Sequence, residues 1–177
     1  MSYGIMPYLV STADMKAWMA SGDAASVQSL VSANKSEIDS LDGLFYDFYD
    51  DEAPYAKDLL TQFVTDSVPA DSGLGAAYGY TFKFLCEHFG RFLSNSEWYP
   101  CSWDQMDLFD GIASYGLPIR FPSPDDFPVI RWIDGSKAEA HLAKLADTPS
   151  TGADYAEFKG WLEQAQATGK DLYLFYH

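Results

Sequence analysis

Both ends of the 177-residue chain have the character of extended strands, and this feature most constrains what the chain can fold into. Residues 2–10 alternate weakly between apolar and polar side chains, and residues 171–176 read Asp-Leu-Tyr-Leu-Phe-Tyr. Runs rich in aliphatic and aromatic residues favour strands. Two such strands can pair with each other, and the pairing would staple the chain ends together. Because Pro7 lacks a backbone N–H, we expect the first strand to lie at a sheet edge or to bend there.

Helical patterns fill most of the chain between these two strands. We expect helices over about residues 12–22, 23–34, 53–66, 76–93, 104–115, 136–147 and 153–167, a turn or helix from residue 36 toward 44, and a further strand over 129–133. The segment 76–93 is apolar nearly all round, which is typical of a buried central helix. The pattern predicts an α+β fold: a mostly helical single domain over residues 1–177, with a small sheet that includes the N- and C-terminal strands.

Two helix starts carry specific capping signals. Asp104 is the expected N-cap of the helix over 104–115, because a carboxylate accepts from the first free N–H groups of a helix. Ser136 and Glu139 have the spacing of a capping box, which predicts the start of the next helix.

The charge balance excludes several kinds of partner. The chain carries 26 acidic and 11 basic residues, for a formal net charge of −15. Nucleic acids and anionic membrane surfaces attract clustered Lys and Arg, so we expect neither as a partner. No apolar run approaches the roughly 20 residues that span a bilayer. The N-terminal segment has no basic region and contains Pro7, so it does not read as a signal peptide, and we expect a cytoplasmic protein.

Metal and cofactor chemistry has little support in the sequence. Cys86 and Cys101 are expected to be free thiols, since a cytoplasmic protein rarely keeps a disulfide. Asp104, Asp107 and Asp110 would lie along one flank of a helix, but their spacing lacks the pattern of a calcium loop. With only three histidines in the chain, we expect no metal site and no cofactor.

An acidic and aromatic stretch between residues 37 and 52 is the first candidate binding surface. It contains seven acids and no base, and aromatic rings lie among the carboxylates over residues 44–52. Rings supply contact area at low entropic cost, and carboxylates steer a basic partner. The alternative is a solvated acidic loop whose rings point into the core. The candidate partner-binding residues are Tyr46, Asp47, Tyr49, Asp50, Asp51 and Glu52.

The second candidate lies on the expected central helix, where functional groups interrupt an apolar sequence. Burial would perturb their pKa values, as it often does at functional sites. Cys86 and His88 face about 200° from each other on a helix, which argues against a Cys–His pair within it. His88 is then either a general base that works with a carboxylate from elsewhere or a hydrogen-bonded core residue. The alternative pocket residues are Tyr80, Cys86, Glu87, His88 and Arg91.

Four stretches of the chain carry a resemblance to a known family. They are residues 1–4 (Met-Ser-Tyr-Gly), 78–90 (Tyr-Gly-Tyr-Thr-Phe-Lys-Phe-Leu-Cys-Glu-His-Phe-Gly), 124–128 (Pro-Asp-Asp-Phe-Pro) and 171–177 (Asp-Leu-Tyr-Leu-Phe-Tyr-His). Together they resemble a family of small uncharacterised bacterial proteins of unknown function, over nearly the whole chain. The resemblance implies a bacterial single-domain protein and carries over no catalytic or binding residue.

Three classes of function are consistent with these observations, and one of them is a structural or scaffolding domain with no small-molecule site. The first is an acidic protein-binding module, with an immunity or antitoxin-like inhibitor of a basic partner as its sharpest form. The alternative is an enzyme or small-ligand-binding protein with a pocket beside the central helix near His88. No nucleotide-binding loop, hydrolase elbow or metalloprotease motif is present in the sequence, which favours the non-enzyme class. The sequence does not specify an oligomeric state.

Overall fold

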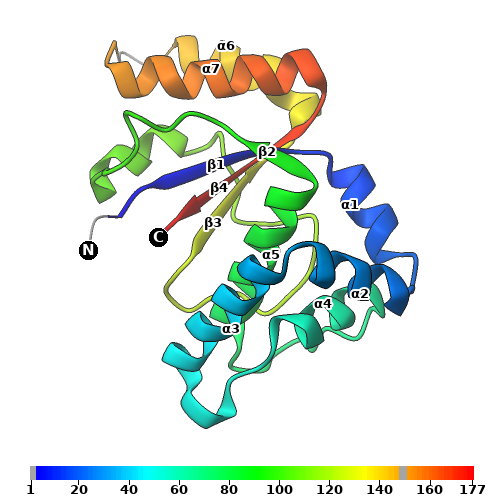
Figure 1. Ribbon diagram of the computed structural model, residues 1–177. Coiled ribbons are helices and arrows are strands. Elements are labelled where there is room, and N and C mark those ends of the chain that lie inside the picture. The colour runs from blue at the N-terminus through cyan, green and yellow to red at the C-terminus, as the bar shows by residue number, and fades with distance from the viewer. Residues whose placement is uncertain (1–2, 148–150) are drawn as a thin grey trace. The chain divides into compact units, whose positions relative to one another are not determined.

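The computed structural model describes residues 3–147 and 151–177 (Figure 1). Its elements in chain order are β1 (Ile5–Val10), α1 (Thr12–Met19), α2 (Ala24–Ala33), α3 (Lys35–Tyr49), the 3₁₀ helix η1 (Asp50–Glu52), α4 (Ala56–Val64), α5 (Gly75–His88), β2 (Gly90–Phe92), the 3₁₀ helix η2 (Trp103–Phe109), β3 (Val129–Ile133), the 3₁₀ helix η3 (Gly135–Lys137), α6 (Ala138–Ala146), α7 (Ala153–Thr168) and β4 (Asp171–Tyr176). The predicted α+β class, mostly helical with a small sheet, is confirmed.

Backbone contacts divide the described residues into two compact units. The sheet unit comprises Met1–Thr12, Cys86–Pro118 and Phe127–His177, and the helical unit comprises Ala13–Leu85 and Ile119–Asp126. The chain therefore passes from one unit to the other more than once. That residues 1–177 act as a single domain stays a prediction.

The sheet unit is built on a four-stranded antiparallel sheet with the strand order β2-β1-β4-β3 (Figure 1). The chain ends β1 and β4 pair over their whole lengths, with Ile5 opposite Tyr176 and Val10 opposite Asp171. β3 pairs with the other side of β4, and β2 pairs with the last three residues of β1. The predicted stapling of the two ends is confirmed.

Pro7 lies inside this sheet, so of the two expected alternatives, a sheet edge or a bend, the edge position is wrong. Its carbonyl accepts a hydrogen bond from the Leu93 N–H at 2.9 Å, on the side of β1 away from β4. In an extended strand, the N–H and C=O groups of one residue point to the same side. The missing N–H of Pro7 therefore faces the segment that follows β2, and the β1–β4 ladder loses no hydrogen bond.

The core of the sheet unit lies between the sheet and α6 and α7, which run side by side along one face of the sheet (Figure 1). Residues at alternate positions of each strand face these helices, as the two-residue period of a strand requires. Trp98 and Trp161 are buried there, and their indole N–H groups donate to the carbonyl oxygens of Asp154 at 3.0 Å and Ser94 at 2.8 Å. Both large rings are therefore buried with their polar atoms bonded.

The helical unit packs around aromatic side chains of α4 and α5. Phe63 and Phe82 are buried, and the Phe121 ring lies 5.8 Å and 5.0 Å from their ring centroids. Phe121 comes from the proline-rich segment 117–128, and the residue is half-buried. At the start of α5, a Cβ on Gly75 would lie 2.2 Å from the Ser123 carbonyl oxygen, so close packing requires glycine there.

The predicted helix over 76–93 is too long, because α5 ends at His88 and residues 90–92 form β2. A Cβ on Gly90 would lie 2.6 Å from the Leu9 carbonyl oxygen and 2.7 Å from that of Cys86. Glycine therefore allows the chain to leave the helix and join β1 directly. Phe92, which falls within the segment predicted to be a buried helix, is 49% exposed on this edge strand.

Two capping predictions are also wrong. The element at 104–115 is the shorter 3₁₀ helix η2, and its capping box is formed by Ser102 and Gln105 rather than by Asp104. No Ser136–Glu139 capping box forms, since the Asp134 side chain caps η3 by accepting from the Ser136 N–H at 2.9 Å. In both places the free N–H groups at the start of the helix are capped by a side chain that precedes the predicted helix.

Substitution of Gly90 tests the turn from α5 into β2. Gly90→Ala should destabilise the protein by about 1–3 kcal/mol, the usual cost of forcing atoms into a packed site. Gly160→Ala is the matched control: nothing lies within 4 Å of its Cβ position inside α7, so it should stabilise by about 0.5–1 kcal/mol. Urea unfolding measures both. Equal effects of the two substitutions would contradict the close approach at Gly90.

Candidate functional site: an acidic and aromatic surface

The predicted binding segment lies on α3 and η1, so its backbone is helical and not the solvated loop of the alternative interpretation. Ile38 and Phe45 are buried on one face of α3, and their spacing of seven residues matches two helical turns. Some aromatic side chains of this segment face solvent and not the core. Tyr46 is 56% exposed and Phe48 is 47% exposed.

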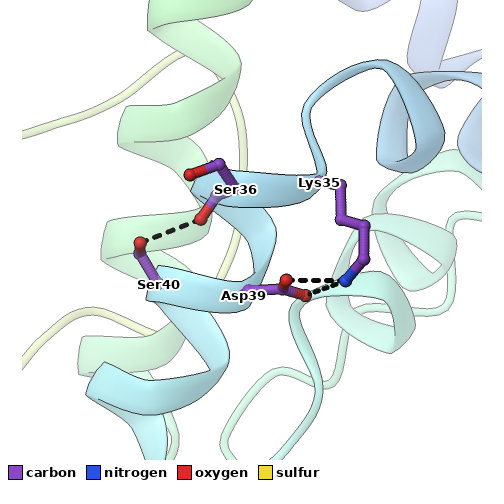
Figure 2. Close-up of polar contacts among 4 residues, drawn as sticks. All are labelled: Lys35, Ser36, Asp39 and Ser40. Atoms are coloured by element: carbon purple, nitrogen blue, oxygen red, sulfur yellow. Dashed lines mark hydrogen bonds and ion pairs between the residues drawn. The ribbon is translucent and has the colours of Figure 1, made fainter.

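Carboxylates in the first half of α3 are engaged in the fold. The Asp39 oxygens accept from the Lys35 ammonium at 2.9 Å and 2.6 Å, one turn apart on the helix surface (Figure 2). The Asp42 carboxylate accepts from the Ala56 N–H at 2.7 Å. This bond caps the N-terminus of α4, where a negative charge is favoured, and ties α4 to α3.

Carboxylates at the other end of α3 have no such role. The side chains of Asp47, Asp50, Asp51 and Glu52 are exposed, and none forms a hydrogen bond or an ion pair within the described part of the chain. The last turn of α3 also contains no basic residue. An acid near a helix C-terminus opposes the helix dipole and costs about 0.3–1 kcal/mol.

Asp50 adds backbone strain at the same place. Its φ of 49° and ψ of −131° lie where residues with a Cβ are rarely found. Such a conformation costs about 1–3 kcal/mol and persists only where the surroundings enforce it. The end of α3 is therefore arranged at the expense of stability.

The acidic–aromatic surface, as we define it, comprises Tyr46, Asp47, Phe48, Tyr49, Asp50, Asp51, Glu52 and Tyr55. Two of these residues, Phe48 and Tyr55, were not among the predicted binding residues. Tyr55 falls within the helix predicted over about residues 53–66, but it is the N-cap of α4 and is 65% exposed. The Phe48 ring lies 5.9 Å from that of Tyr80 and 6.2 Å from that of Tyr49, which holds it in place. The apolar pattern of the predicted helix includes Tyr55, so the sequence carried no signal that marks it as an exposed N-cap.

Among the alternative pocket residues, Cys86 and Glu87 lie at the end of α5 that belongs to the sheet unit. Cys86 is fully buried, so its thiol does not meet solvent. The exposed Glu87 carboxylate accepts from the Tyr8 hydroxyl at 2.6 Å. Burial, followed by this bond, raises the pKa of Tyr8 far above its usual value. This hydrogen bond joins the end of α5 that belongs to the sheet unit to β1.

His88 and Arg91 contact residues that are not among the alternative pocket residues. The exposed His88 ring packs edge-on against Phe89 at 4.8 Å, and partial desolvation lowers its pKa. The Arg91 guanidinium donates to the Gln164 side-chain oxygen at 2.7 Å. Tyr80 belongs to the helical unit, where its ring contacts that of Phe48. These contacts join no two of the alternative pocket residues, and the pocket stays a prediction.

Residues 3–147 and 151–177 contain no group of three or more His, Cys, Asp or Glu side chains placed to hold a metal ion. Asp110, one of the three aspartates weighed as ligands, instead pairs with Arg131 at 2.9 Å. Within the same described ranges, no helix has the length and apolar character that crossing a membrane requires.

The strain at Asp50 predicts that a glycine there stabilises the protein. Asp50→Gly should release about 1–3 kcal/mol of strain, less about 0.5–1 kcal/mol for the greater freedom of glycine in the unfolded chain. The expected net gain is about 1 kcal/mol in urea unfolding. Asp51→Gly is the control, since Asp51 has no positive φ and should only lose stability. A loss at both positions would contradict the strain.

Two histidines predict how stability depends on pH. Desolvation lowers the pKa of His88, and desolvation together with the nearby Lys137 and Lys144 charges lowers that of His141, from a usual value of 6.5. Below pH 6.5 the unfolded chain then binds protons more readily than the folded one, so stability should fall as the pH drops from 6.5. The double variant His88→Gln, His141→Gln should lose this dependence in urea unfolding at pH 7.5, 6.5 and 5.5. An NMR titration that gives either folded histidine a pKa above 6.5 would contradict the prediction.

Comparison with known proteins places the chain in a family. The family described as Domain of unknown function (DUF7691) matches residues 1–177, which is the whole sequence. No curated protein and no solved structure matches the chain. The predicted resemblance to an uncharacterised family is confirmed by this match. The chain belongs to the family described as Domain of unknown function (DUF7691).

Proposed function

We propose that this protein is an acidic protein-binding module whose acidic–aromatic surface docks a basic partner protein. The observation that carries the proposal is that exposed rings alternate with four carboxylates that bond to nothing in the described chain. These carboxylates oppose the helix dipole, and one of them sits on strained backbone. A partner that supplies positive charge would offset both costs.

Charge would act mainly on the rate at which the two proteins associate. The net charge of −15 attracts a basic protein from a distance and raises its association rate, and added salt screens this attraction over about 8–10 Å. Two lysines, Lys35 and Lys57, flank the stretch on either side, so the segment between them presents negative charge alone. Steering of this kind favours a basic surface over a neutral one.

The rings would supply the affinity. Tyr46 and Tyr55 are more than half exposed, so a partner can cover much of each ring. The backbones of α3 and α4 are already ordered and tied together by the Asp42 bond to Ala56, so docking orders little more of the chain. Aromatic residues held in this way dominate the energetics of many interfaces.

An immunity or antitoxin-like inhibitor is the sharpest form of the proposal. Such an inhibitor would mask a cationic functional surface of its partner, and the small size and high negative charge of the chain suit that task. We place it in the bacterial cytoplasm, in line with the free thiols of Cys86 and Cys101 and with the resemblance noted above.

The alternative, an enzyme or small-ligand-binding protein with a pocket near His88, stays a prediction. His88 is exposed and its lowered pKa leaves it neutral near pH 7, which a general base requires. Glu87, the nearest carboxylate in sequence, is already bonded to Tyr8. The contacts therefore favour the binding module.

Neutralising the surface tests the proposal. The variant Asp47→Asn, Asp50→Asn, Asp51→Asn, Glu52→Gln should bind the basic partner captured by the native protein with an association rate at least tenfold lower at low salt, because steering contributes factors of about 10–1,000. Capture from native lysate identifies the partner, and surface plasmon resonance at low and high salt measures the rates. The difference between the two proteins should shrink as salt rises.

A control variant with the same change in net charge tests whether the slower association comes from the acidic–aromatic surface or from the net charge of the whole protein. Asp104→Asn, Asp107→Asn, Asp125→Asn, Glu139→Gln alters four exposed acids elsewhere and should lower the rate much less. Tyr55→Ser should raise the dissociation rate and leave folding intact, since its ring is 65% exposed. Equal slowing in both charge variants, or no basic partner at either salt concentration, would overturn the proposal.

A further inference from the structure

Arg131 is the one charged residue that the described part of the chain buries, with 7% of its surface exposed. It lies on β3 opposite Leu174 and belongs to the sheet unit, whereas the acidic–aromatic surface belongs to the helical unit. Its Nη1 donates to the Asp110 carboxylate at 2.9 Å, but the Asp110 side chain is 66% exposed. A buried cation is costly unless good partners surround it, and this pair leaves one partner in solvent.

The other edge of the guanidinium is only half used. Its Nη2 donates to the Tyr115 hydroxyl at 2.5 Å, and its Nε is buried with no hydrogen-bond partner. The Nε and Nη2 donors of arginine lie side by side on one edge, at a spacing that matches the two oxygens of a carboxylate. A single hydroxyl oxygen fills half of a site that two oxygens would fill completely.

Tyr115 is placed to uncover this edge. Its ring lies 4.5 Å from the guanidinium carbon, yet the residue is 62% exposed. Exposed side chains change rotamer on the picosecond to nanosecond timescale, so the ring can swing away without unfolding its surroundings. The Phe109 ring, 5.9 Å from the guanidinium carbon, would still shield the site from water and strengthen its hydrogen bonds.

We propose that the Nε and Nη2 edge of Arg131 is a binding site for a carboxylate, with Tyr115 as its lid. The ligand oxygens would replace the Tyr115 hydroxyl at Nη2 and give Nε its missing acceptor, while Asp110 stays at Nη1. The Lys144 ammonium, which donates to the Gly111 carbonyl at 2.8 Å next to Asp110, adds a second positive charge to this neighbourhood. Because Asp110 already offsets one charge and the protein is strongly acidic, a monoanionic carboxylate fits better than a phosphate dianion.

The NMR resonance of the Arg131 Nε–H group reports directly on carboxylate binding at this site. The chain contains three arginines, so Arg91→Lys and Arg120→Lys assign the Arg131 signal in ¹⁵N-labelled protein. Sodium acetate should shift this signal in a saturable way, and sodium chloride at equal ionic strength should not. Tyr115→Phe removes the competing hydroxyl and keeps the ring, so acetate should bind roughly fivefold more tightly, the worth of one hydrogen bond.

Tyr99→Phe is the matched control, because its exposed ring contacts Gly4 and it should leave acetate binding unchanged. Inorganic phosphate is the rival probe, and saturation by phosphate with none by acetate would overturn the assignment to a carboxylate. A signal that acetate leaves unmoved in both the native protein and Tyr115→Phe would overturn the site and make Arg131 a purely structural ion-pair residue. Neither result bears on partner capture by the acidic–aromatic surface, so the two proposals fail separately.

Discussion

The antiparallel ladder between β1 and β4 is the constraint on which the sheet unit depends. These two strands are the chain ends and also the centre of the sheet, so each outer strand attaches through one of them. The cross-strand pair of Tyr8 and Tyr173 fixes the register, since their hydroxyls bond to Glu87 at 2.6 Å and Thr12 at 2.9 Å. A shift of either strand by one residue would turn its tyrosine ring to the opposite face and break the bond that its hydroxyl makes. The central ladder therefore joins residues from opposite ends of the sequence, which makes the folding topology non-local.

The parts of this fold that local chemistry decides could be predicted from the sequence. Asp23 caps α2 through the Ala25 N–H at 2.8 Å, and Gly169 ends α7 with a left-handed φ of 64°, both as their residue types indicate. The boundary at Gly90 could not, because the apolar period of α5 continues into β2 and a three-residue strand carries no period of its own. Pairing with β1, a contact between distant parts of the chain, decides that boundary.

The candidate surface was predictable in its charge but not in its backbone. Acids near the end of a helix oppose its dipole, so local propensity argued against extending α3 through the acidic segment. Burial of Ile38 and Phe45 outweighs this effect, since each large apolar side chain gains about 1.5–3 kcal/mol when buried. Tyr55 was missed for a related reason: a helix pattern predicts which residues share the buried face, but it does not mark the residue at which the helix begins.

The two units differ in whether their carboxylates form hydrogen bonds within the fold. The sheet unit has twelve acids against six bases, and several of its carboxylates are bonded: Glu157 accepts from Ser94 and from the backbone of Ser96 and Glu97. The helical unit has fourteen acids against five bases, and those that end α3 are bonded to nothing in the described residues. Like charges gathered this way destabilise the folded state. This fold therefore engages Asp42 in capping a helix and leaves the carboxylates at the end of α3 exposed to solvent.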